Sequence, residues 1–283
     1  MYHLLNNLNL DNREYFSLLF ESMHGNDNCY LIAEDIITNF KKYVSDSLNG
    51  KIMFLDKFND DYNYSTSIIL DDTIVNVNIN VYVDHNKFEI KGRSINYDKY
   101  SIYIDELVTD KIPQYADIEN ILIHELHHIY QNIKSKGKID AFNKIDYHRV
   151  LKAAMDNNLP DYISNFFYCL YLMNKIEIDA NVPLIYNELK SLNVAKEDIK
   201  EKMKMMPSWK KYNSVRAMMN KVLDYDKIKI EKIAQKYCEV FRMSYHPTDI
   251  NIVKNLAIKN VNNANKVLRR MAVNAKKYYD ELN

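Results

Sequence analysis

The segment of this chain with the clearest chemical potential lies at positions 124–128. It reads His124-Glu125-Leu126-His127-His128 and so contains H-E-x-x-H. On an α-helix, residues four apart share a face, so His124 and His128 can direct both imidazoles toward one Zn²⁺ at about 2.0–2.1 Å. Glu125 is turned to one side of them, where its carboxylate can act as a general base on water made acidic by that metal. The spacing therefore predicts metal-dependent hydrolysis.

Apolar residues at helical spacing surround this motif. They are Ile118, Leu122, Leu126, Ile129 and Ile133. No Pro or Gly interrupts the segment, and Glu125 carries the only charge between positions 121 and 130. A buried amphipathic helix with one functional carboxylate is predicted. The alternative is a helix whose histidines only form hydrogen bonds in the core. His127, about 100° round the helix from His128, is expected to be packed or to support a metal ligand, and not to bind the metal itself.

A catalytic zinc site usually needs a third protein ligand. Gln131 lies three residues after His128 with no Gly nearby, which excludes the H-E-x-x-H-x-x-G-x-x-H pattern of metzincins. A Glu from a later helix would give the alternative set of two His and one Glu. The candidate is Glu177, and its buried setting is predicted by the apolar residues that precede it. Asp179 and His148 remain alternatives.

Together these segments resemble the glutamate zincins (gluzincins), a group of zinc metallopeptidases. In many of them a second helix carries E-x-x-A-D or E-x-x-x-D, whose Glu binds zinc. The resemblance implies Glu177 as the ligand, Ala180 as the small residue that lets two helices approach, and Asn181 where an Asp orients a zinc-bound His. Asn181 is a departure, since its amide oxygen accepts a hydrogen bond without the charge of Asp. Pro183 is a second departure and is predicted to end or kink the helix just past the site.

The predicted function is therefore that of a zinc-dependent metallopeptidase that acts on a peptide or protein. Zn²⁺ would be held by His124, His128 and Glu177, and Glu125 would activate water. The donor to the oxyanion remains open among four side chains, namely His148, Tyr147, Tyr168 and Tyr171. One rival is a structural or interaction protein with a zincin fold, such as a phage component, whose metal serves stability. Another is a helical binding module with an accidental H-E-x-x-H.

Composition predicts a folded protein of the cytoplasm. The chain has 283 residues, 47% of them hydrophobic, with only 4 Gly and 5 Pro, which favours helices over a turn-rich β architecture. Its abundant Asn, Lys, Ile and Tyr are typical of an AT-rich genome, such as that of a low-GC bacterium or its phage. The three isolated cysteines lack metal or disulfide spacing, and neither a signal peptide nor a membrane span is expected.

The net charge is zero but unevenly distributed. Residues 1–182 carry 17 Lys and Arg against 27 Asp and Glu, whereas residues 183–283 carry 21 against 11. Attraction between the two parts of the chain is the favoured interpretation. A basic face for nucleic acid or an acidic partner is the alternative, although no nucleic-acid motif supports it. The sequence indicates no oligomeric state.

The predicted fold class is α+β, zincin-like. N-terminal helices and a mostly antiparallel sheet pack on the H-E-x-x-H helix and are followed by an all-helical C-terminal part. Residues 12–48 are expected to be helical with a break at Gly25, and residues 51–106 to form strands. The strands include 75–83, then a hairpin turn at 84–87, and a last strand near 100–105 at the sheet edge. Further helices are expected near 145–157, 162–192, 196–205, 211–223, 226–243 and 250–281. Residues 1–192 are assigned to the catalytic domain and 193–283 to the helical region.

Overall fold

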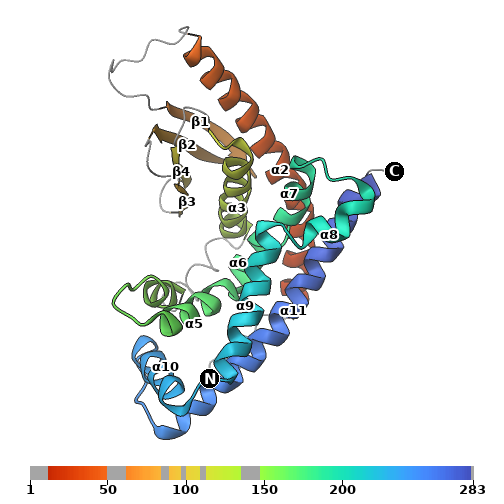
Figure 1. The fold of residues 1–283 in the computed structure, drawn as a ribbon. Coiled ribbons are helices and arrows are strands. Elements are labelled where there is room, and N and C mark those ends of the chain that lie inside the picture. Colours follow the sequence, from red (N-terminus) through yellow and green to blue (C-terminus); the bar gives the residue numbers. More distant parts are fainter. Residues whose placement is uncertain are drawn as a thin grey trace. The chain divides into compact units, whose positions relative to one another are not determined.

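A computed structural model describes residues 12–49, 62–83, 89–96, 100–108, 113–134 and 147–281 of the chain (Figure 1). It combines a small four-stranded sheet with a larger number of helices. The chain divides into two compact units, Met1–Gly137 and Lys138–Asn283. The boundary predicted at residues 192 and 193 therefore falls inside the second unit. The beginning of the predicted strand region, residues 51–61, and the predicted turn at 84–87 lie outside the described residues.

The first unit contains the sheet. Its strands are β1 (Tyr62–Leu70), β2 (Thr73–Val83), β3 (Glu89–Asn96) and β4 (Tyr100–Val108). They are arranged in the order β1-β2-β4-β3. The β1–β2 and β3–β4 pairs are antiparallel, whereas β2 and β4 are parallel. The sheet is therefore mostly antiparallel, as predicted.

Two expectations about the strands are wrong. The turn after β2 was expected to make a hairpin, but β2 and β3 are not neighbours, because β4 lies between them. The strand near residues 100–105 was expected at the edge, but β4 pairs on both sides, and β3 is the outer strand. Alternation of apolar and polar residues is a property of one strand and does not specify its neighbours, so the sequence could not decide the strand order.

The alternation in β2 has the predicted consequence. Val75, Val77, Ile79 and Val81 are fully buried on one face of the sheet. The other face carries polar ladders between opposed side chains. These are Ser65–Asn78 at 2.9 Å, Ser67–Asn76 at 2.8 Å and Asn80–Asp105 at 2.9 Å. The sheet thus has one apolar face that must be covered.

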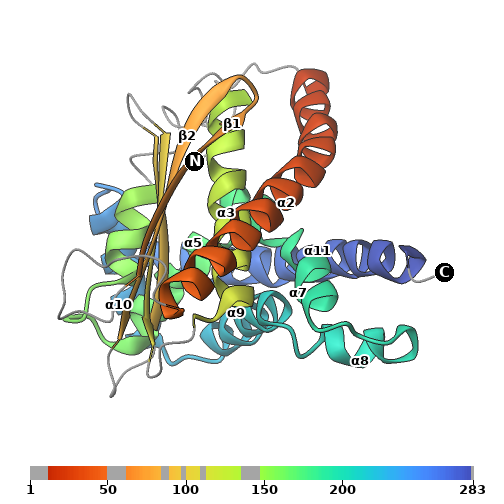
Figure 2. The same ribbon diagram turned by 90° about the horizontal axis from the view of Figure 1, so that it is seen from above.

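Two helices cover that face, α2 (Asn12–Leu48) and α3 (Tyr115–Lys134) (Figure 2). Helix α3 packs on β3 and β4, and α2 packs on α3 and β1. The predicted break in the first helix is wrong, since α2 continues through Gly25. A single Gly inside a helix costs only about 1 kcal/mol, which a long helix packed on its neighbours can absorb.

The start of α3 is held by a carboxylate from the sheet. Glu106 of β4 is fully buried, and its Oε1 accepts a hydrogen bond of 2.9 Å from the backbone N–H of Gln114. Its Oε2 has no hydrogen-bond partner among the described residues. Burial raises the pKa of Glu106 to about 7, an effect opposed by the Gln114 hydrogen bond and reinforced by Asp117. A buried carboxyl group with a raised pKa therefore marks the entry of the H-E-x-x-H helix.

We expect Glu106 to make stability depend on pH. The folded pKa lies above the unfolded value near 4.5, so Glu106 stabilises the fold fully below pH 4.5. That contribution is lost as the pH rises through about 7. The loss is on the order of 3 kcal/mol, because each pH unit between the two pKa values corresponds to about 1.4 kcal/mol. Urea denaturation between pH 5 and pH 8 should show Glu106→Gln gaining stability over the wild type as the pH rises. Parallel curves for the two proteins would contradict this.

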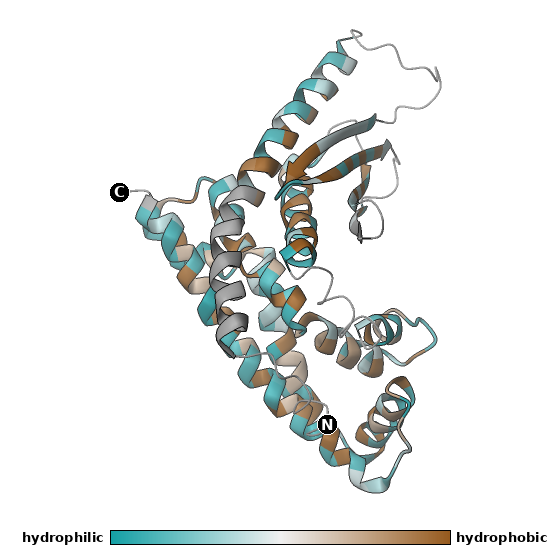
Figure 3. Ribbon diagram, turned by 180° about the vertical axis from the view of Figure 1, so that it is seen from behind, coloured by the Kyte–Doolittle hydropathy of each residue, from teal (hydrophilic) through white to brown (hydrophobic). Residues whose placement is uncertain are grey.

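The second unit is helical throughout its described part. Its first helical segment spans residues 147–154. The following helices are α5 (Asp161–Leu172), α6 (Lys175–Asn181), α7 (Leu184–Ser191), α8 (Ile199–Met203), α9 (Pro207–Leu223), α10 (Lys227–Val240) and α11 (Ile250–Glu281). Short 3-10 turns at Lys196–Asp198 and Pro247–Asp249 precede α8 and α11. Polar and apolar positions alternate along α11, which packs on α9 (Figure 3).

The single helix expected over 162–192 is divided into three. Asn174 begins α6 by accepting a hydrogen bond from the N–H of Ile176. Pro183 follows the end of α6 and precedes α7, as its missing N–H requires. The expectation that Pro183 ends the helix past Glu177 is thus confirmed. Glu177 consequently lies in a seven-residue helix whose position depends on its packing.

Candidate metal centre

The two histidines of H-E-x-x-H converge on one side of α3. His124 Nε2 and His128 Nε2 lie 3.0 Å apart, and the rings meet edge to face at an interplanar angle of 81°. Two zinc ligands at about 2.0–2.1 Å in tetrahedral geometry lie about 3.3 Å from each other. Nitrogens this close must share either a proton or a cation. The pair therefore fits two imidazole ligands of one metal ion.

Gln131 lies beside the outer nitrogen of His128. Its Oε1 is 3.5 Å from His128 Nδ1. An acceptor at Nδ1 favours the tautomer whose proton is on that nitrogen, which leaves Nε2 unprotonated and able to bind a metal. The residue that excludes the metzincin pattern thus lies where it can orient a ligand.

Glu125 is buried beneath the outer strand. Its side chain is 7% exposed. A Cβ atom added at Gly92 of β3 would lie 3.5 Å from both Cγ and Oε1 of Glu125, and 2.1 Å from Ile121 Cγ2. Strand β3 can therefore approach α3 this closely only with a Gly at position 92. The absent side chain sets the distance between the strand and the carboxylate.

Gly92→Ala should destabilise the first unit by about 1–3 kcal/mol, the usual cost of overpacking. The contact is with a methyl group of a β-branched residue, whose χ1 is nearly fixed in a helix, so the strand has to move. Chemical denaturation measures the effect. Ile121→Ala is the matched control, because removing that methyl should make Gly92→Ala less costly in the double variant. If the stability losses of Gly92→Ala and Ile121→Ala simply added in the double variant, the contact between the two positions would be contradicted.

His127 is packed, as its position on the helix predicts. It is 3% exposed, and its ring lies 6.4 Å from that of Tyr30 on α2, edge to face. Its Nε2 has no hydrogen-bond partner within the described part of the chain. Burial and the neighbouring His128 lower the pKa of His127 to about 3. His127 is therefore a neutral core residue that contributes to the contact between α2 and α3.

Glu177 is buried in the second unit, with hydrogen-bond donors at both carboxylate oxygens. Its side chain is 2% exposed. The Tyr147 hydroxyl donates to Glu177 Oε1 at 2.7 Å, and Asn181 Nδ2 lies 3.4 Å from Oε2. The Tyr171 hydroxyl is 3.2 Å from that of Tyr147, and burial followed by the charge of Glu177 raises the pKa of Tyr171. Two donors favour an ionised carboxylate, the form that binds a metal.

The two alternatives to Glu177 have different surroundings. Asp179 accepts a hydrogen bond of 2.8 Å from Arg270 and has Lys175 at 4.0 Å, so it belongs to an ion-pair cluster. His148 is exposed and lies edge to face with Tyr147. Of the three candidates, Glu177 alone is fully buried.

The environment of Asn181 differs from the expectation. Its amide oxygen was expected to accept from a zinc-bound His, but it accepts a hydrogen bond of 2.7 Å from Lys211 Nζ. Its Nδ2 donates to the backbone carbonyl of Glu177 at 2.7 Å. Sequence reasoning did not identify Lys211, which is 30 residues from Asn181 and lies on α9. No local pattern signals that contact.

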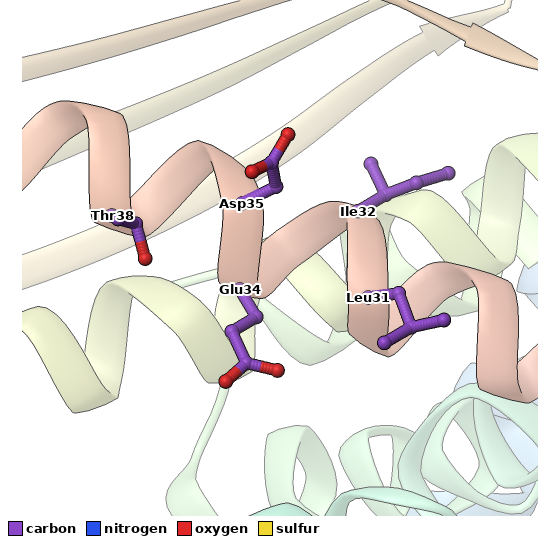
Figure 4. A pocket seen from close by; sticks show the side chains of 5 residues that line it. All are labelled: Leu31, Ile32, Glu34, Asp35 and Thr38. Atoms are coloured by element: carbon purple, nitrogen blue, oxygen red, sulfur yellow. The ribbon is translucent and has the colours of Figure 1, made fainter.

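Each unit has a hollow in its described surface. One is on α2, where the carboxylates of Glu34 and Asp35 point to different sides of the helix and so do not converge (Figure 4). The other, about 190 Å³, is in the second unit and is lined by aromatic and aliphatic residues that include Tyr147 and Tyr171. The second hollow shares these two tyrosines with the surroundings of Glu177.

No family model, no curated protein and no solved structure matches this chain. Within the described residues, no helix is both long and apolar enough to cross a membrane. The function therefore has to be inferred from the residues of the site and their geometry.

Proposed function

We propose that this protein is a zinc-dependent metallopeptidase of the zincin type. The observation that carries the proposal is the convergence of His124 Nε2 and His128 Nε2 at 3.0 Å, with the buried Glu125 beside them on α3. A helix whose histidines only fill a core does not require two ring nitrogens to meet. A buried carboxylate next to a pair of nitrogen ligands is the arrangement that hydrolysis needs.

The proposed third ligand is Glu177. In this proposal Glu177 would join His124 and His128 as the third side chain that holds the ion. Two imidazoles and one carboxylate match the catalytic zinc sites that leave a fourth position open. The same donors also accept other divalent transition metals, so the identity of the ion needs a direct measurement. The two donors at the Glu177 carboxylate support its ionised form.

In the proposed hydrolysis of a peptide bond, the metal and Glu125 would have separate roles. A bound Zn²⁺ would lower the pKa of water and polarise the substrate carbonyl. Glu125 would take a proton from the attacking water as its oxygen bonds to the carbonyl carbon. It would then give that proton to the leaving amine nitrogen as the C–N bond breaks. Its burial would keep bulk water from competing for the proton.

The sheet offers a place for a peptide substrate. Strand β3 pairs with β4 and with no other described strand, so backbone groups remain along its outer edge. An extended peptide can add to such an edge through main-chain hydrogen bonds. Gly92 brings that strand against Glu125. A peptide on β3 would therefore lie close to the proposed base.

Metal analysis of the purified protein, followed by cleavage of a broad peptide library, tests the proposal. We expect about one equivalent of Zn²⁺, its loss in His128→Ala, and cleavage that needs the metal. Absence of any bound metal after incubation with Zn²⁺ would overturn the site. Tight metal binding without cleavage would instead favour a metal that stabilises a structural protein.

A further inference from the structure

We infer that Lys211 and Asn181 act as a positioning pair that fixes the Glu177 carboxylate, a role that rests on the proposed metal site. Lys211 lies on α9, and its ammonium group donates to Asn181 Oδ1 at 2.7 Å. Asn181 is fully buried on α6, one helical turn after Glu177. The three residues form a chain of contacts within the second unit.

The ammonium group determines which way the Asn181 amide faces. An amide has one end that accepts hydrogen bonds and one that donates, whereas an ammonium group only donates. Lys211 therefore requires Oδ1 on its own side, which places Nδ2 toward Glu177. There Nδ2 lies 2.7 Å from the Glu177 backbone oxygen and 3.4 Å from Oε2.

This orientation leaves the Glu177 carboxylate suited to a metal. Tyr147 donates to Oε1 and Asn181 Nδ2 faces Oε2, so both carboxylate oxygens lie against donors of the protein. If the amide reversed, Oδ1 would face the carboxylate, and two acceptors would repel each other. Lys211 would therefore act on the Glu177 carboxylate through the orientation of the Asn181 amide. In the gluzincin pattern an Asp at position 181 would orient a His, so this role is different.

Charge alone would have the opposite effect on metal affinity. A cation near the site repels a metal ion, so removal of Lys211 by itself should tighten binding. Asn181→Leu separates the two effects, because it removes the amide with almost the same shape and no change in charge. Substitution of a residue that orients a metal ligand typically lowers metal affinity 10- to 100-fold. We expect a loss of that size in Asn181→Leu.

Competition with a chelator would measure Zn²⁺ affinity in Asn181→Leu, Lys211→Met and the double variant. The positioning role predicts non-additive effects, since Lys211→Met can disturb the carboxylate only while the amide is present. Lys211→Arg, which keeps both charge and donor, should retain most of the affinity. Wild-type affinity in Asn181→Leu, or additive effects in the double variant, would overturn the inference. Asn181→Ala also removes the amide and serves as a second variant in case Asn181→Leu misfolds. Its melting temperature, if equal to that of the wild type, shows that a loss of Zn²⁺ affinity does not come from misfolding.

A second measurement needs no metal. In the metal-free protein, the Asn181 side-chain amide should give a separate NMR signal that exchanges slowly with water, and Lys211→Met should abolish the slow exchange. If the Asn181 amide protons of the wild type exchanged rapidly with water, the Lys211–Asn181 pair would be ruled out even if the protein binds a metal. Slow exchange in a wild-type protein that binds no metal would leave the pair in place and reject the metal site instead.

Discussion

Glu125→Gln should leave the bound metal in place and lower peptide turnover by about 10²- to 10⁴-fold, the usual contribution of a positioned acid–base group. Gln has the size of Glu and can form hydrogen bonds, but it has no basic carboxylate. Glu125 is 7% exposed and lies against β3 at Gly92, so the isosteric change should preserve packing. Metal content and turnover of a cleaved peptide are the two measurements.

Glu119→Gln is the matched control for this experiment. It removes the same charge from the same helix, but at a position that the motif does not use, so both metal and turnover should remain near the wild-type values. Loss of metal in Glu125→Gln would mean that the residue supports the site rather than the proton transfer. Unchanged turnover would place the base elsewhere.

Glu177→Ala should weaken Zn²⁺ binding by more than 100-fold, which exceeds the 10- to 100-fold range typical of residues behind the ligands. The variant removes a buried carboxylate that has Tyr147 at 2.7 Å. Without it, two histidines on one helix would have to hold the ion alone. Chelator competition at fixed pH gives the affinity, and the pH matters because neutral imidazoles bind metal.

Asp179→Ala is the matched control, since it removes a carboxylate two residues away on the same short helix. Asp179 pairs with Arg270 at 2.8 Å, so its loss should cost at most about 1 kcal/mol of stability. Its effect on metal affinity should stay within 10- to 100-fold. If Asp179→Ala lost the metal and Glu177→Ala kept it, Asp179 would be the ligand.

Local periodicity was enough to predict the helix that carries the proposed site. His124 and His128 are four residues apart, and a helix alone brings them to one face, with 3.0 Å between the two Nε2 atoms. The buried face of β2 follows in the same way from its alternating Val, Ile and Asn residues. The end of α6 before Pro183 reflects the missing N–H of that residue. These features depend on neighbouring residues only.

The arrangement of the strands required the tertiary structure. A hairpin between β2 and β3 was a reasonable expectation from a short connection. It fails because β4 inserts between them and pairs in parallel with β2. The alternation that defines each strand is compatible with several strand orders, and the order that covers the apolar face against α2 and α3 is a property of the whole unit.

The surroundings of the proposed site also came from tertiary structure alone. Gly92 meets α3 at Ile121, and Lys211 meets Asn181 across 30 residues of sequence. Neither contact has a sequence signature, because a lone Gly or Lys is compatible with many environments. The sequence by itself determined which groups could bind a metal and which could act as a base. Packing between distant segments decided which side chains orient Glu177 and which strand lies against Glu125, since those contacts depend on how close the elements can approach.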